Sequence, residues 1–314
     1  MANNWYEHKE KSKTGVGYAL SLFLLKCFPA WFVRVMAFVI GFFYWLFSRE
    51  ERQISREFLK LAEADGADFG GKKSSTLKHF ISFALNLVET LQSWGGKIPS
   101  KNVKWQNDDV ADLIKNVNSK KGAVCMISHT GNAQMMRALA SMNEVGTERK
   151  VKITTLMDTK VTGGFVKLTG KINAEADFHI VSADNIGPET IFLLQQRLEQ
   201  GEVVVIAGDR TGAHSQRYIE LPFLGKKAKF PYGVYVLLSL LNVPVYFIFG
   251  MRHKDISIFS KYDMFVKKND VDFNCPRKDR AERIEQTARN FAAQEELHVK
   301  KHPYQWYNFF DFWG

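Results

Sequence analysis

The sequence predicts an α/β fold, in which a mixed, largely parallel sheet is flanked by helices, with an N-terminal hydrophobic helical segment that anchors it to a membrane. Short apolar runs typical of buried strands alternate with helical runs after residue 122. Residues 18–47 are almost free of charge. No internal repeat or low-complexity linker divides the 314 residues, which favours one large domain behind an apolar prefix, with the boundary placed between residues 1–48 and 49–314.

The apolar prefix has the composition of a membrane-associated segment. Its only charges between residues 18 and 47 are Lys26 and Arg34, and Pro29 divides it. Residues 31–48 would form a helix about 27 Å long, slightly short of a hydrocarbon core of roughly 30 Å, and Arg34 could snorkel from its end. Basic residues flank both sides, so we favour two helices bent at Pro29 in one leaflet over a single span. A hydrophobic core hairpin of a soluble protein is the alternative.

The remaining elements follow from periodicity and turn residues. Residues 49–64 form a charged amphipathic pattern that ends at Asp-Gly and Gly-Gly turns, and 76–94 form a second helix with one apolar side. Predicted strands cover 123–128, 151–157, 178–181, 203–207, 217–221, 245–250 and 256–259. Helical runs are clearest at 187–200 and 232–241.

Composition limits the class of partner. The formal net charge is +10, which favours anionic partners such as a membrane surface or an acidic protein. The aromatic residues gather in apolar runs at the two termini and do not interleave with basic residues, so no nucleic-acid partner is expected. Cys27, Cys125 and Cys275 are far apart and odd in number, which predicts neither a disulfide framework nor a zinc site.

The first chemical motif is Ser128-His129-Thr130-Gly131-Asn132-Ala133-Gln134, directly after the predicted strand 123–128. A histidine at a strand end can accept a proton at neutral pH from an attacking hydroxyl or amine. Gly131 and Asn132 suit a tight turn into a helix, whose first backbone N–H groups could receive an oxyanion. A histidine that only satisfies turn carbonyls is the alternative.

The second motif is Gly208-Asp209-Arg210-Thr211-Gly212, which follows the predicted strand 203–207. Open α/β sheets collect their chemistry at the carboxyl ends of adjacent strands, so the acid and the arginine are candidates for a site shared with His129. The planar guanidinium of Arg210 suits a phosphate, carboxylate or thioester oxygen. A solvated turn or an internal salt bridge is the alternative.

These motifs resemble those of the lysophospholipid acyltransferase superfamily, whose signature is a histidine, four residues, then an acid. The nearest branch is that of the bacterial lipid A biosynthesis (lauroyl/myristoyl) acyltransferases. Later blocks around 208–210, 221–225 and 230–233, and the ending Pro303-Tyr304-Gln305-Trp306-Tyr307, resemble that branch in order and spacing, and the resemblance covers roughly residues 10–314.

The resemblance implies transfer of an acyl group from an acyl carrier protein or coenzyme A thioester to a hydroxyl or amine of a lipid-like acceptor. No metal or tightly held cofactor is implied. His129 would be the general base, Gln134 occupies the place of the acid, and Asp209 completes the catalytic set. Three interpretations of Gln134 are open: the amide suffices, Asp209 supplies the missing charge, or the protein no longer catalyses.

The substrate-binding residues expected from the same blocks are Gly131, Asn132, Gly208, Arg210, Thr211, Lys226 and Lys229. The lysines would meet anionic lipid head groups or an acidic carrier protein, although a solvated charge run is an equal alternative. His298 and His302 have a spacing found in metal sites, but a solvated helical face is the preferred interpretation.

The function expected is therefore that of an acyltransferase on the cytoplasmic face of the bacterial inner membrane, at an anionic membrane surface. A catalytically silent, membrane-bound scaffold that binds acyl chains or a carrier protein is one alternative, and Gln134 favours it. A thioesterase that uses water as acceptor is another.

Overall fold

The computed structural model describes residues 27–106, 109–132, 147–148, 151–157, 178–183, 186–210, 217–259 and 261–313. Within these residues, one 7-stranded sheet has the order β1-β9-β8-β2-β5-β3-β4. Its strands are β1 (Val103–Trp105), β2 (Ala123–Ile127), β3 (Ile153–Met157), β4 (Phe178–Ser182), β5 (Val203–Ala207), β8 (Val245–Arg252) and β9 (Tyr262–Lys268).

The sheet is mixed and mostly parallel, as the sequence predicts. β8 and β9 pair antiparallel, while β1–β9, β8–β2, β2–β5, β5–β3 and β3–β4 pair parallel. Every residue of β2 and β8 is buried, which is usual for strands whose two faces are both covered by helices. β2 and β5 lie side by side in register, with Ile127 opposite Ala207, so the residues that follow these two strands emerge next to each other.

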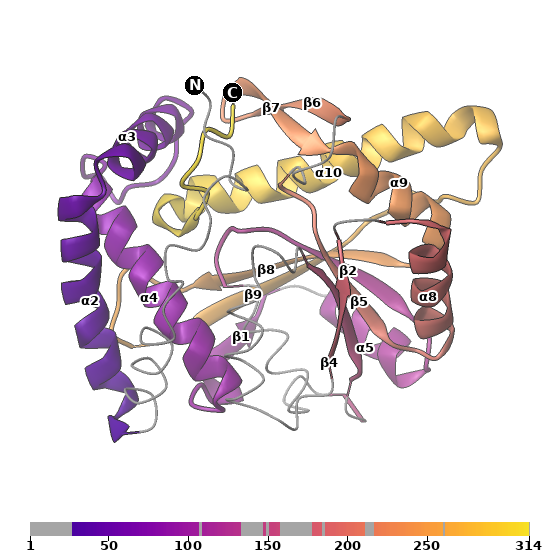
Figure 1. Cartoon of the computed structure of the whole chain (residues 1–314), viewed down its shortest axis with the longest axis horizontal. Helices are drawn as coiled ribbons and strands as arrows, with labels where there is room; N and C mark the ends of the chain where they lie inside the picture. The colour runs from indigo at the N-terminus through magenta and orange to yellow at the C-terminus, as the bar shows by residue number, and fades with distance from the viewer. Residues whose placement is uncertain are drawn as a thin grey trace.

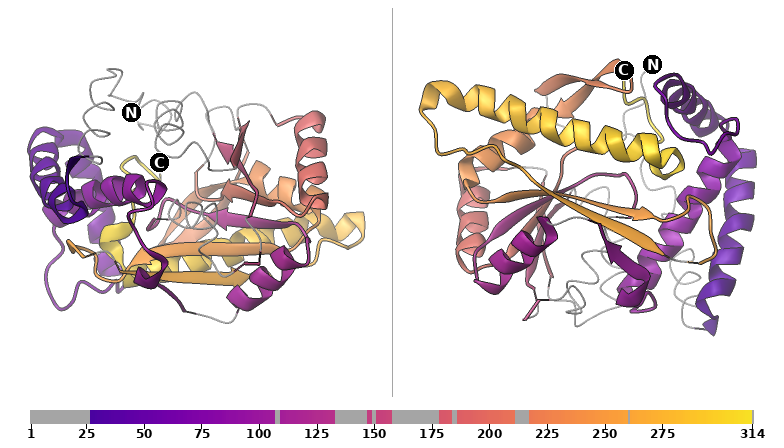
Figure 2. Two further views of the ribbon diagram at one scale, coloured as in Figure 1. Left: turned by 90° about the horizontal axis from the view of Figure 1, so that it is seen from below. Right: turned by 180° about the vertical axis from the view of Figure 1, so that it is seen from behind.

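Alternate residues of the strands supply two separate cores. Val124 and Met126 of β2 face the larger core, which is formed with α8 (Pro188–Glu199), α9 (Tyr232–Leu241) and α10 (Arg280–Lys301). Cys125 and Ile127 face the smaller core, which is formed with α5 (Asp109–Asn118). Figures 1 and 2 show α10 crossing one face of the sheet, with α5 on the opposite face.

A separate hairpin of β6 (Tyr218–Phe223) and β7 (Lys226–Pro231) closes the larger core beside α10. Its outward positions alternate with the inward Ile219, Leu221 and Phe223. Short 3-10 helices in the described part of the chain lie at Ser100–Asn102, Arg277–Asp279 and Pro303–Gln305.

The helices α2 (Ala30–Phe47), α3 (Arg49–Ala64) and α4 (Thr76–Trp94) form a layer at one end of the molecule (Figure 1). α2 packs closely along α4: a side chain at Gly41 would meet the backbone of Ile81 at 3.0 Å. The opposite side of α2, its outer face, exposes large apolar side chains by 39–78%: Trp31, Val35, Val39, Ile40, Phe42, Phe43, Leu46 and Phe47. Among the described helices, α2 is the one long and apolar enough to cross a membrane.

Most predicted elements are confirmed, but the strand predicted at 256–259 is wrong. These residues form part of the loop between β8 and β9, where Ile256 packs on the small α2–α4 cluster around Ala37 and Leu85. The apolar alternation there reflects packing on helices instead of pairing in a sheet. The sequence analysis did not predict β1, β7, β9 or α5.

Two polar residues lie elsewhere than expected. Arg34 does not snorkel: it is 7% exposed, its Nε donates to Gln92 Oε1 at 2.8 Å and its Nη1 donates to the carbonyl of Ile258 at 3.0 Å. His298 does not belong to a solvated face, because it is 4% exposed and its ring contacts Phe249 and Phe265. Burial holds the pKa of His298 at about 3, so this imidazole is a neutral core residue at physiological pH.

Candidate active site

The candidate site is built on the neighbouring carboxyl ends of β2 and β5. His129 follows β2 and Asp209 follows β5. The backbone N–H of His129 donates to Asp209 Oδ2 at 2.9 Å, and the ring Nδ1 lies 2.9 Å from Oδ2 and 3.0 Å from Oδ1. Asp209 is fully buried, whereas the His129 side chain is 38% exposed. The carboxylate thus holds the ring from the protein side and leaves part of the imidazole open.

The electrostatics of the pair keep Asp209 ionised and His129 neutral. Burial alone would raise the pKa of Asp209, but the charge and hydrogen bonds of His129, with the charge of Arg210, lower it to about 2. Burial and Arg210 lower the pKa of His129, and Asp209 opposes them without reversing the shift. At neutral pH the pair is therefore a carboxylate and a neutral imidazole. The carboxylate accepts a hydrogen bond from Nδ1–H, which leaves Nε2 as the basic nitrogen.

The C-terminal segment holds Arg210 against this pair. The Nε of Arg210 donates to Asn308 Oδ1 at 2.7 Å, and Nη2 donates to the carbonyl of Tyr307 at 3.2 Å. The amide nitrogen of Asn308 reaches Asp209 Oδ2 at 3.4 Å, so one side chain touches both charged groups. The guanidinium also lies 5.5 Å from the ring centroid of Phe310. Burial lowers the pKa of Arg210 to about 10, so the group stays cationic at neutral pH.

The turn after His129 is fixed by hydrogen bonds on both sides. The N–H of Gly131 donates to the carbonyl of Gln305 at 2.7 Å, and the N–H of Asn132 donates to the carbonyl of Gly250 at 2.6 Å. Both N–H groups are used inside the protein, while the start of the following helix, to which the oxyanion was assigned, lies outside the described residues. Gly131 has a φ of +69°, and a Cβ at this position would collide with the carbonyl of Gly250. Asn132 is 3% exposed and accepts from the Thr90 hydroxyl at 3.2 Å.

A second buried acid lies behind the pair. Glu295 of α10 is fully buried, and its Oε1 accepts from the Thr130 hydroxyl at 2.8 Å. Burial and the negative charge of Asp209 raise the pKa of Glu295 well above its ordinary value, against the opposing effects of Thr130, Ser128 and Arg210. Thr130 and Ser128 flank His129, so this neutral carboxyl supports the segment that carries the imidazole.

Gly208 occupies a position that only glycine fits. Its N–H donates to the carbonyl of Ile127 at 2.9 Å, and its carbonyl accepts from the hydroxyl of Tyr235 at 2.9 Å. A Cβ would lie 2.9 Å from the Phe291 ring. These contacts fix the backbone that places Asp209.

The other predicted residues are less closely connected with the pair. Lys226 is exposed, and Lys229 lies 5.1 Å from the ring centroid of Tyr218; both belong to the β6–β7 hairpin. Gln134 and Thr211 lie outside the described residues.

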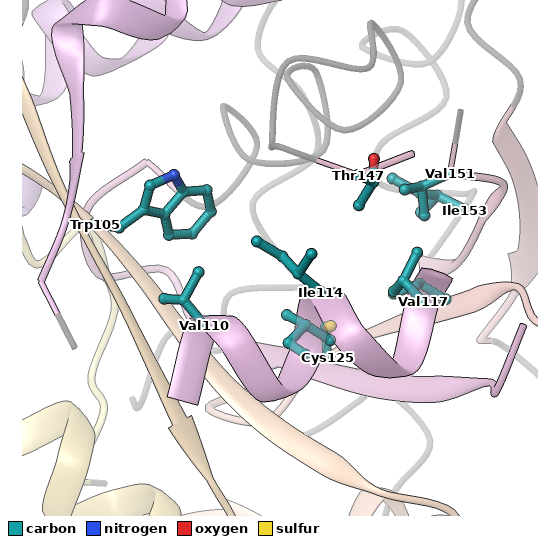
Figure 3. A pocket seen from close by; sticks show the side chains of 10 residues that line it. Trp105, Val110, Ile114, Val117, Cys125, Thr147, Val151 and Ile153 are labelled. Carbon is teal, nitrogen blue, oxygen red and sulfur yellow. The ribbon is translucent and has the colours of Figure 1, made fainter. Parts of the chain in front are cut away.

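An apolar pocket opens between α5 and the sheet (Figure 3). The cavity is small, about 40 Å³, and it opens to solvent. Cys125, on its floor, precedes His129 by four residues of β2 and the adjoining chain, or about 13 Å of extended backbone. Ser128 and Thr130, which flank His129, face Glu295 of α10. The lining side chains are Trp105, Val110, Leu113, Ile114, Val117, Cys125, Thr147, Val151, Ile153 and Val203.

The sequence analysis missed Asn308, Glu295 and Tyr235 as supports of the site. Asn308 lies three residues beyond the Gln305 of the C-terminal signature, so that signature was the one signal pointing to this end of the chain. Glu295 stands in a charged helix and has no local mark that separates it from exposed acids.

The comparison with protein families decides the identity. The family model described as bacterial lipid A biosynthesis acyltransferase matches residues 10–313. The chain belongs to this family. No curated protein matches it. Membership makes this lipid A-type acyltransferase an enzyme that takes an acyl donor and a lipid acceptor, and the His129–Asp209 pair lies within the matched region.

Proposed function

We propose that this acyltransferase moves a fatty acyl group from an acyl carrier protein or coenzyme A thioester to a hydroxyl or amine of a lipid A-type acceptor. The observation that carries the proposal is the buried carboxylate of Asp209 at 2.9 Å from Nδ1 of a partly exposed His129. This arrangement suits a general base, since the carboxylate stabilises the imidazolium that forms when Nε2 takes a proton.

The reaction then runs in two proton-balanced steps. Nε2 of His129 removes the proton of the acceptor hydroxyl as its oxygen attacks the thioester carbonyl. The carbonyl becomes a tetrahedral oxyanion, the carbon–sulfur bond breaks, and the imidazolium returns its proton to the leaving sulfur. No acyl-enzyme forms. Asp209 stays ionised throughout, in keeping with its lowered pKa of about 2.

Arg210 is the proposed cationic partner of the oxyanion or of a substrate phosphate. Its charge is retained at neutral pH, and Asn308 orients the planar guanidinium by accepting a hydrogen bond from Nε. Gly208 and Thr211 flank this element as part of the proposed substrate-binding set, and Gly131 and Asn132 would act by fixing the turn beside it. Gly208 would hold Asp209 in place, and the adjoining Arg210 and Thr211 would contact the substrate.

The apolar pocket beside α5 is the proposed site for the acyl chain. Its lining includes Cys125, four residues before His129, and consists almost entirely of apolar side chains. A thioester carbonyl beside His129 would send its chain back along β2 toward Cys125. Binding there would release the apolar surface of the chain from water.

Lys226 and Lys229 of the hairpin are proposed to meet an acidic carrier protein or anionic head groups. Reversing the charges of Lys226, Lys227 and Lys229 together should raise the KM for carrier-protein donor at low salt. An unchanged KM would exclude the docking role. The proposed location is the cytoplasmic face of the bacterial inner membrane, because thioester donors of this kind are made in the cytoplasm.

The departure from the family motif at Gln134 is tested by Gln134→Glu. Of the three interpretations of this residue, the geometry favours the one in which Asp209 supplies the charge, since Asp209 already occupies Nδ1. We therefore expect less than a threefold change in kcat. A large gain in kcat would mean that the neutral amide of Gln134 limits the activity of the wild-type enzyme.

The whole proposal is tested by lipid mass spectrometry of a deletion strain that carries either the wild-type protein or His129→Ala. We expect the acylated lipid to return only with the wild type. If both proteins restore the same lipid profile, the silent scaffold is the better description. Release of free fatty acid from the thioester without acylated lipid, measured with the purified enzyme, would indicate a thioesterase.

A further inference from the structure

We propose that the loop between β8 and β9, residues 253–261, is a second membrane contact that lies with the outer face of α2 on an anionic lipid bilayer. The proposal concerns how the enzyme sits on its membrane and does not depend on the acyl-transfer mechanism. It rests on the exposure, charge and anchoring of the described residues of this loop.

Exposure marks the loop as an interaction surface. Phe259 at its tip is 72% exposed, which is close to the 78% of Phe47 at the end of α2. Together with the outer face of α2, it gives an apolar surface far larger than the isolated exposed side chains that soluble proteins carry. The surface is rich in phenylalanine and includes Trp31, as is usual for helices that lie in the lipid interface.

The loop is fixed to α2 and not merely near it. Nη1 of the buried Arg34 donates to the carbonyl of Ile258 at 3.0 Å, and Ile256 packs on the cluster around Ala37. Figure 2 shows this loop beside α2 and α4. Phe259 therefore cannot move independently of the outer face of α2.

Charge complementarity selects an anionic bilayer as the partner. Lys254 and Lys261 flank the apolar tip of the loop, and both are exposed. The loop's one acid, Asp255, is turned inward, where its Oδ1 accepts from Gln305 Nε2 at 2.8 Å and lies 3.2 Å from His302 Nδ1. The surface thus offers lipid an apolar tip between two cations, and each cation near an anionic leaflet adds to binding.

Packing also sets the orientation of α2. One side of the helix is covered by α4 from the Gly41 contact to the Arg34–Gln92 hydrogen bond. A spanning α2 would carry α4, with its half-buried Lys78 and its buried Glu89, into the hydrocarbon core, where charges are costly. α2 therefore lies in the plane of the bilayer, with its outer face and Phe259 on the lipid side.

The same loop is joined to the catalytic turn. Gln305 accepts from the backbone N–H of Arg252 and donates to Asp255, while its carbonyl accepts from Gly131. Gln305 therefore contacts both the base of the membrane loop and the turn after His129. This connection places the candidate site at a fixed height above the lipid surface.

The test uses a single environment-sensitive fluorophore on full-length protein whose Cys27 and Cys275 are replaced by serine. It is attached at Phe259→Cys, or at Phe192→Cys as the matched control, since Phe192 is 69% exposed on α8 at the opposite end of the molecule. Vesicles are phosphatidylcholine with or without phosphatidylglycerol, and carry lipids with quenchers at different depths. We expect quenching at 259 that increases with phosphatidylglycerol, and none at 192.

Two further positions distinguish the orientations of α2. Probes at Trp31→Cys and Phe47→Cys should report the same shallow depth, whereas a spanning helix about 27 Å long would place them at opposite leaflets. Opposite depths, or an unquenched probe at 259 in vesicle-bound protein, would overturn the proposal. A blue shift at 259 that depends on protein concentration without vesicles would instead identify a second copy as the occupant.

A binding measurement completes the test. Phe259→Asp should lower the partition coefficient onto phosphatidylglycerol-containing vesicles about tenfold, the effect expected for one phenylalanine withdrawn from lipid, and Phe192→Asp less than twofold. Equal effects of the two substitutions would contradict a specific role of the loop. Thermal unfolding of both variants shows whether each still folds.

Discussion

The carboxylate of Asp209 contacts His129 twice, accepting from its backbone N–H at 2.9 Å and lying 2.9 Å from its ring Nδ1. The contact with the backbone N–H fixes the main-chain position of His129, and the contact with Nδ1 fixes the orientation of its imidazole ring. Burial opposes the ionisation of Asp209, but the hydrogen bonds and charge of His129 and the charge of Arg210 lower its pKa and keep this carboxylate charged. A local His-x-x-x-x-acid motif is therefore not the only way this fold can orient its histidine.

Asp209→Asn should lower kcat by about 10²–10⁴, with little change in KM, because the amide can present its NH₂ to Nδ1 and hold the wrong tautomer. Initial rates with a purified acyl thioester measure the effect. The matched control is Asp263→Asn, which alters the His253–Asp263 pair, 2.8 Å apart with an exposed histidine, and should leave kcat within about twofold. Equal losses in the two variants would remove Asp209 from the mechanism.

The pH dependence of kcat/KM follows from the lowered pKa of His129. The neutral imidazole is the active form, so activity is present above this pKa and is lost as the pH falls through it. We expect the acid limb below about pH 6.5, the ordinary value for histidine. Since Asp209 raises the pKa of His129, Asp209→Asn should move the limb further toward acid. A limb above pH 7 in the wild type would contradict the assignment of the base.

The pairing of His129 with Asp209 shows where sequence reasoning stops. Each residue could be found at the end of an apolar run, but their contact depends on β5 lying next to β2, although β3 and β4 come between them in the chain. Strand order is set by the packing of the whole sheet. The motif spacing pointed first to Gln134, which is local, because local spacing is all that one sequence displays.

The burial of polar side chains was the other property that could not be predicted from the sequence. Arg34 and His298 were expected at polar surfaces, and both are buried because partners from distant segments, Gln92 and Ile258 for Arg34 and two phenylalanine rings for His298, surround them. The strands with continuous apolar runs, β2, β5 and β8, were predicted correctly. β9 was missed because its sequence, Tyr-Asp-Met-Phe-Val-Lys-Lys, has no regular alternation of apolar and polar residues, although burial along the strand does alternate.

A bulkier side chain in the apolar pocket should shorten the acyl group that the enzyme prefers. Ile114→Phe fills part of the space between α5 and Cys125. Each methylene that no longer fits loses about 0.8 kcal/mol of burial, or roughly fourfold in kcat/KM for the longer donor. Competition between donors of different length, read by mass spectrometry of the product, measures the shift. Ile114→Leu keeps the volume and is the control. An unchanged chain-length profile would place the acyl chain elsewhere.

Glu295 gives a prediction about stability as well as activity. Its pKa in the folded protein is raised well above its ordinary value, chiefly by burial and by the charge of Asp209. The unfolded chain ionises this group from about pH 4.3 upward while the folded chain does not. The free energy of unfolding of the wild type therefore loses about 1.4 kcal/mol per pH unit from this group as pH rises toward the folded pKa.

Glu295→Gln removes this titration and keeps an oxygen that can accept from the Thr130 hydroxyl. Its stability relative to wild type should therefore increase as pH rises from about 4.3 toward the folded pKa, measured by urea denaturation of the detergent-solubilised protein. Its kcat should stay within about threefold of wild type, since a neutral carboxyl and an amide present the same acceptor. Glu295→Ala, which leaves Thr130 without that acceptor, should lower kcat more than tenfold, because Thr130 adjoins His129. If the stability difference between Glu295→Gln and wild type does not change with pH above about pH 5, the carboxyl is ionised in the folded protein, and the charge beside Asp209 has been assigned wrongly.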